Sequence, residues 1–71
     1  MGYNDLQVLA LFINSPFDSF SIKNISQLLN LSLPGVYWIV KGLEAQNFII
    51  RTNGYPAEYK INVELFTFKK S

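Results

Sequence analysis

The stretch LSLPGVYWIVKGLEAQNFII, residues 31–50, decides the fold that this chain adopts. Its apolar residues recur at helical spacing, which predicts a helix that begins after the N-cap Ser32 and tolerates Pro34 in its first turn. Asn47 is expected to end the helix, because asparagine is suited to the position after a helix. The residues predicted to form its buried stripe are Val36, Ile39, Val40 and Leu43.

Two shorter helices are predicted upstream. The first is capped by Asn4 or Asp5 and ends at the turn-forming run NSPFDS, residues 14–19. Phe20 then lies in a short extended piece, and Ser21 caps the second helix. The apolar positions expected in the core are Leu6, Leu9 and Ile13, widened by Val8, Leu11 and Phe12, in the first helix and Ile22, Ile25, Leu28 and Leu29 in the second.

A β-hairpin is predicted after the third helix. Two β-prone runs, FIIRT (48–52) and EYKI (58–61), flank the tip NGYPA (53–57). The tail NVELFTFKKS leaves two interpretations open, a short helix capped by Asn62 and ending at Lys69 and Lys70, or an irregular strand. The predicted fold is mainly α with a small β-hairpin (α+β), in one domain spanning residues 1–71.

The order helix, extended piece, helix, helix, hairpin is typical of a winged helix–turn–helix, a three-helix core plus a wing. The segment ISQLLNLSLPGVYWIVKGLEAQNFIIR, residues 25–51, resembles the core of winged-helix transcription regulators of the MarR and ArsR type. That family has an apolar I-x-x-L-L-x-[IL]-S, then a recognition helix and L-E-x-x-G-[LF]-I. The matching residues are Ile25, Leu28, Leu29, Leu31, Ser32, Val36, Val40, Leu43, Glu44, Phe48 and Ile49, and Asn47 stands where the family often has glycine.

The resemblance implies sequence-specific binding of double-stranded DNA by a small transcription regulator. The recognition helix, about residues 32–46, lies in the major groove, and the wing, about residues 50–60, lies on the flanking backbone. Tyr37 and Lys41 are expected on the groove-facing side with Trp38 at its flank, and Glu44 is expected to lie away from the DNA. The implied DNA-binding residues are Lys23, Asn24, Ser32, Leu33, Pro34, Tyr37, Lys41, Arg51, Asn53, Tyr55 and Lys60.

Several of these residues also have a purely structural interpretation. For Trp38 we favour packing against the first helix or the tail, whereas for Tyr37 packing and nucleic-acid contact are both open. An apolar patch for a partner protein suits both aromatic residues. Lys23 as a solvated side chain, and Arg51 paired across the strands with Glu58, are the corresponding interpretations of two cations.

Composition restricts the chemistry. The chain has 71 residues with a net charge of +1, and it contains neither cysteine nor histidine. Thiolate and imidazole metal sites are therefore excluded, and the five acidic residues are too scattered to form a catalytic pair. We expect neither an enzyme nor a cofactor or metal. No apolar run reaches the roughly 20 residues that span a bilayer, so we expect a cytoplasmic protein without a membrane segment.

Other classes of function stay open. The low net charge and the apolar third helix favour a protein–protein interaction subunit of a larger assembly with the same fold. The segment YKINVELF, residues 59–66, faintly suggests a DNA replication-initiator module. Pro56 and Tyr59 loosely match the wing of Z-DNA-binding winged helices, but the asparagine and tyrosine typical of their recognition helix are not at the corresponding positions.

A homodimer is expected, because so small a core cannot enclose every apolar residue. The excess lies mostly outside the helix–turn–helix and comprises Tyr3, Leu11, Phe12, Phe17, Leu65, Phe66 and Phe68. The resemblance places the dimer contact at the first helix and the C-terminal tail. Two recognition helices in such a dimer would lie about 34 Å apart, one turn of B-form DNA.

Overall fold

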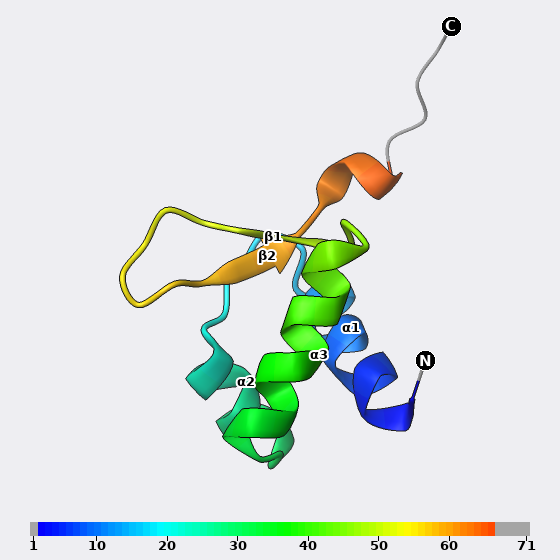
Figure 1. The fold of residues 1–71 in the computed structure, drawn as a ribbon. Coiled ribbons are helices and arrows are strands. Elements are labelled where there is room, and N and C mark those ends of the chain that lie inside the picture. The colour runs from blue at the N-terminus through cyan, green and yellow to red at the C-terminus, as the bar shows by residue number, and fades with distance from the viewer. Residues whose placement is uncertain (1, 67–71) are drawn as a thin grey trace, which may run out of the picture.

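The computed structural model describes the backbone of residues 2–66 and the side chains of residues 2–64. Three helices surround one core, and a two-stranded antiparallel hairpin projects beside them (Figure 1). The elements are α1 (Tyr3–Asn14), α2 (Ile22–Leu29), α3 (Leu33–Ala45), β1 (Ile49–Arg51), β2 (Tyr59–Ile61) and the 3-10 turn η1 (Val63–Phe66). The predicted mainly α fold with a small β-hairpin is confirmed.

Side-chain caps determine where α2 and α3 begin, as predicted. The Ser21 hydroxyl accepts from the Asn24 N–H at 3.1 Å, and the Asn24 side chain accepts from the Ser21 N–H at 3.2 Å, which is a capping box. Ser32 accepts from the Gly35 N–H at 3.2 Å. Asn47 has a φ of 65°, so it adopts the left-handed conformation expected after α3.

The predicted cap of α1 is wrong. The N-cap is Gly2, and no side chain caps this end of the helix. Asn4 and Asp5 lie inside the first turn instead, where the negative charge of Asp5 interacts favourably with the helix dipole.

The core joins all three helices to the hairpin. Its buried members are Val8, Phe12, Ile25, Val36, Val40, Leu43, Ile49, Tyr59 and Ile61. The prediction for α3 is confirmed, with Ile39 partly buried against the core. Val8 and Phe12 are the buried residues of α1, whereas Leu6 and Ile13 of its predicted stripe are exposed. In α2 the prediction fails for Leu28, which is 61% exposed.

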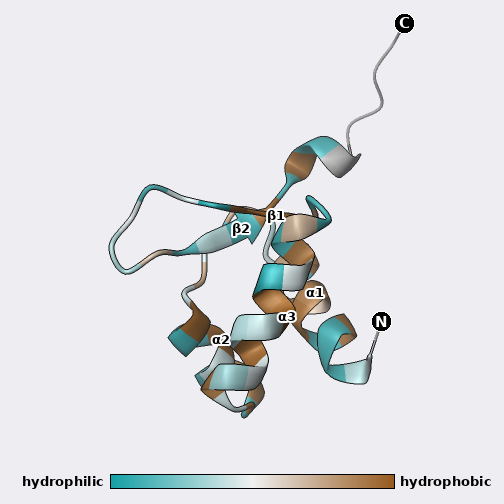
Figure 2. Ribbon diagram, viewed as in Figure 1, coloured by the Kyte–Doolittle hydropathy of each residue, from teal (hydrophilic) through white to brown (hydrophobic). Residues whose placement is uncertain are grey.

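These errors in α1 have one cause. After a hydrophilic first turn, hydrophobic residues recur along the rest of α1 (Figure 2), so two of its faces fit a core equally well. Only the position of the other helices selects the face with Val8 and Phe12. Phe12 was also among the residues expected to be in excess, yet it is fully buried.

One residue of β2 joins the hairpin to the loop before α2. Arg51 and Tyr59 are directly opposite each other in the hairpin, and the neighbouring Thr52 N–H donates to the Glu58 carbonyl at 2.8 Å. The N–H and carbonyl of Tyr59 therefore point away from β1. They bond to Phe20, whose extended conformation was predicted, in two hydrogen bonds of 2.8 Å.

The chain turns again directly after β2. The Asn62 side chain accepts from the Glu64 N–H at 3.2 Å, and residues 63–66 form η1. Of the two interpretations of the tail, this start agrees with the short helix capped by Asn62. Its predicted end at Lys69 and Lys70 lies outside the described residues.

We expect Phe12→Ala to lower the free energy of unfolding by about 3–5 kcal/mol, because it leaves a cavity in the centre of the core. Trp38→Ala removes a ring that is 72% exposed and should cost less than about 1 kcal/mol. Urea denaturation followed by circular dichroism measures both. Equal losses in the two variants would contradict the core assignment.

We expect Gly42→Ala to stabilise the domain by about 0.5–1 kcal/mol. Gly42 is in the interior of α3, and a Cβ atom there would meet no atom within 4 Å, so alanine improves helix propensity without a clash. Gly35→Ala is the matched control, because its Cβ would lie 2.9 Å from the Ser32 hydroxyl that caps the helix. In thermal unfolding, Gly42→Ala should have a higher midpoint temperature than the wild type and than Gly35→Ala. The reverse order would contradict this prediction.

Candidate nucleic-acid interface

Trp38 stands at the centre of the outer face of α3, which we define as Pro34, Trp38, Lys41 and Ala45. Successive helical residues are about 100° apart, so a residue midway between the buried Val36 and Val40 points away from the core. The exposed fraction is 72% for Trp38 and 42% for Tyr37. The prediction that Trp38 packs against the first helix or the tail is therefore wrong for the described residues.

The sequence analysis placed Tyr37 on the outer side of the helix and Trp38 at its flank, and the structure shows the opposite arrangement. Tyr37 is one step from Val36 and lies at the flank, whereas Trp38 is outermost. This position could have been found from the sequence by applying the 100° step to the predicted stripe. The predicted DNA-binding set contains Pro34 and Lys41 of this face but omitted Trp38 and Ala45.

Tyr37 contacts both Trp38 and Lys41. The two rings meet edge to face, with centroids 5.3 Å apart at 83°, and the Lys41 Nζ lies 5.5 Å from the centre of the Tyr37 ring. The edge-to-face contact limits the orientations that the exposed indole adopts. The three residues form a small aromatic and cationic cluster on one side of α3.

An acidic residue borders this cluster. The Glu44 carboxylate lies 3.8 Å from the Lys41 ammonium, one turn along the helix, so it adjoins a residue of the predicted DNA-binding set, although it was expected to lie away from the DNA. Both side chains are about one-third exposed, and such a pair contributes only about 0.3–0.5 kcal/mol. An anion such as phosphate could therefore replace Glu44 as the partner of Lys41 at little cost.

The start of α3 adds polar and apolar groups. Ser32, Leu33 and Pro34 are all exposed there. The Ser32 oxygen already accepts the capping bond from Gly35, which leaves its O–H as a donor for an acceptor such as a phosphate oxygen.

Lys23 and Asn24 adjoin in sequence but border different hollows. Lys23 lines a shallow groove with Ser21, Ile22, Pro56, Ala57 and Tyr59, between the start of α2 and the returning arm of the hairpin. Tyr59 in that groove is directly opposite Arg51, so the two cations flank the same part of the hairpin. Asn24 instead lines a second hollow, between the α1–α2 loop and α2, and its side-chain oxygen is occupied in the capping box.

The hairpin divides its cations between two faces. Arg51 shares a face with the buried Ile49, while Lys60 is opposite Ile50 on the other face. The Arg51–Glu58 pair is not formed: Arg51 is opposite Tyr59, so Glu58 is directed to the other face, where its carboxylate accepts from the Ser19 hydroxyl at 2.8 Å. Asn53 and Tyr55 lie exposed at the hairpin tip.

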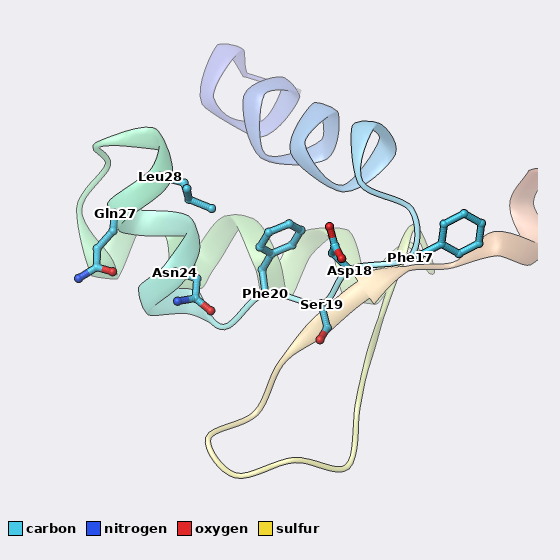
Figure 3. Close-up of a pocket in the computed structure, with 7 residues that line it drawn as sticks. All are labelled: Phe17, Asp18, Ser19, Phe20, Asn24, Gln27 and Leu28. Carbon is cyan, nitrogen blue, oxygen red and sulfur yellow. The ribbon is translucent and has the colours of Figure 1, made fainter.

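The second hollow lies between the α1–α2 loop and α2 (Figure 3). It is lined by Phe17, Asp18, Ser19, Phe20, Asn24, Gln27 and Leu28. Phe17 is at one end and points away from the other side chains. The lining holds one carboxylate and no cation, so this hollow is unsuited to phosphate and lies outside the nucleic-acid interface that we propose.

The described residues contain no group of three or more acidic, cysteine or histidine side chains that could hold a metal ion. None of their helices combines the length and the apolar character that crossing a membrane requires.

Comparison with known proteins gave no match to a family model, a curated protein or a solved structure.

Proposed function

We propose that this domain is a winged helix–turn–helix that binds double-stranded DNA as a small cytoplasmic transcription regulator. Its α3 would enter the major groove and its hairpin would act as the wing on the flanking backbone. The observation that carries the proposal is α3 itself, which buries one face and leaves the opposite face, with Trp38 and Lys41, uncovered. The function is binding, without a catalytic step, cofactor or metal.

Charge supports a modest affinity for one copy. Four cations lie among the described side chains, namely Lys23, Lys41, Arg51 and Lys60, and the hairpin pair is split between two faces. Because each phosphate contact adds a salt-dependent increment, so few contacts bind DNA weakly. Two copies on one site would multiply the affinity.

We expect Lys41→Ala and Arg51→Ala each to weaken duplex binding and to reduce the slope of log affinity against log salt by about 1. Glu44→Gln should strengthen binding, because it removes the negative charge 3.8 Å from Lys41. Lys41→Arg, which keeps the charge, is the control. Fluorescence anisotropy of a labelled duplex at low and moderate salt measures all four variants. Binding that is absent, or insensitive to salt and to these changes, would refute the proposal.

A second apolar surface supports a homodimer. Tyr3, Leu6, Ala10 and Ile13 form an outer stripe on α1, at alternating spacings of three and four residues that favour helix–helix pairing. At the end of α1 this stripe meets an apolar groove lined by Ile13, Pro16, Phe17, Ile61 and Val63. We propose that two copies pair through this stripe and groove.

The size of this surface suits such a contact. Tyr3 is 76% and Phe17 is 93% exposed, and with their apolar neighbours they present about 500 Å² per copy. Two copies would bury about 1,000 Å², the lower bound for a specific interface. Leu11, in contrast, is partly buried against the protein's own core. The contribution expected from Leu65, Phe66 and Phe68 concerns side chains outside the described set.

We expect a dimer at micromolar concentration that Phe17→Glu converts to a monomer, because the charge would be buried without a partner. Trp38→Glu is the matched control, since it places the same charge on an exposed aromatic position of another surface. Sedimentation equilibrium gives the masses. A monomeric wild type, or a dimer lost only in Trp38→Glu, would contradict pairing through α1.

Protein–protein interaction is the second candidate function. The observation that favours it is the apolar character of α3's exposed residues, among them Leu33, Tyr37 and Trp38. A replication-initiator module would differ in biological role while binding DNA through the same surface. The titration of duplex binding against salt distinguishes a protein–protein interaction module, which would not bind DNA, from a DNA-binding domain.

A further inference from the structure

We propose that Trp38, supported by Tyr37 and Lys41, is a stacking platform for an unpaired nucleobase. This inference rests on the proposed nucleic-acid binding and specifies the ligand. The domain would prefer DNA in which at least one base is unstacked, such as a bulge, a mismatch or a single strand.

The shape of the site suits stacking better than reading of base-pair edges. Trp38 projects between Pro34 and Ala45, whose side chains are small. An indole has one N–H donor and no acceptor, so it cannot form the two-bond patterns that identify a base pair in the major groove. Its broad face contacts any base, and exposed aromatic residues in single-strand-binding proteins act in this way.

Charge complementarity identifies a nucleic acid as the occupant. The Lys41 ammonium is 5.5 Å from the centre of the Tyr37 ring, and that ring meets the indole edge to face. A base stacked on Trp38 would therefore place its phosphate within the field of Lys41. The weak contact between Lys41 and Glu44 does not prevent this exchange.

The area of the patch argues against a second copy of the chain in this position. The exposed parts of Tyr37 and Trp38 amount to about 250 Å². Two copies facing each other here would bury about 500 Å², which is well below the size of a stable interface. One or two stacked bases, in contrast, would cover most of this area.

The experiment uses the intrinsic fluorescence of the full chain, because Trp38 is its only tryptophan. Three unlabelled DNAs of one sequence are titrated, a perfect duplex, the same duplex with a central unpaired base, and the single strand. We expect the two DNAs with unpaired bases to quench Trp38 and to bind at least fivefold more tightly than the duplex. Trp38→Ala should lower their affinity about ten- to hundredfold and abolish the preference, measured by anisotropy with labelled DNA.

Two controls keep the inference separate from the proposed function. Trp38→Phe should retain most of the preference for DNA with unpaired bases, because it keeps an aromatic face. Lys41→Ala should weaken the binding of all three DNAs. If Trp38→Ala still binds in a salt-dependent way and the wild type never distinguished the three DNAs, the stacking role is refuted while duplex binding stands. If no DNA binds the wild type, the proposed function itself fails and the stacking role fails with it.

Discussion

The backbone bridge between Phe20 and Tyr59 is the constraint on which the rest of the structure depends. Its two 2.8 Å hydrogen bonds connect the α1–α2 loop to the hairpin, and the Ser19–Glu58 hydrogen bond lies beside them. The Phe20 ring continues the connection into the core, where it meets Phe12 edge to face with centroids 5.6 Å apart. A two-stranded hairpin by itself is marginally stable, so this third segment and the core behind it hold the hairpin in place.

This arrangement determines which surfaces are available to partners. Tyr59 brings Arg51 and the groove beside Lys23 into one neighbourhood, while α3 packs on β1 through its buried stripe. Because α3 directs Val36 and Val40 inward, Trp38 points away from the core and is 72% exposed among the described residues. The proposed role of α3 follows from this geometry rather than from net charge, which is only +1.

Helices α1 and α3 are each apolar on more than one side, and each exposes an apolar outer side. Both α1 and α3 face a shared core, so their outer sides point in different directions. A dimer through the outer stripe of α1 would therefore leave both α3 helices uncovered. The proposed pairing and the proposed DNA binding would therefore use separate residues, which allows them to be tested independently.

Local signals in the sequence determined the element order, the caps Ser21 and Ser32, the left-handed Asn47 and the buried stripe of α3. Each depends on residues a few positions apart, so spacing and side-chain chemistry are sufficient to predict them. Only the tertiary structure decided which face of α1 is buried, because both faces are apolar, and that Glu58 bonds to Ser19, 39 residues away, rather than to Arg51. Of the candidate site, Tyr37 and Lys41 were predicted to share a neighbourhood, but Lys23 and Asn24 separate, as do Arg51 and Lys60. These separations follow from local geometry, the 100° step between successive helical residues and the alternation of side chains along a strand, whereas which hollow each residue borders depends on how the elements pack, and no short-range pattern encodes that.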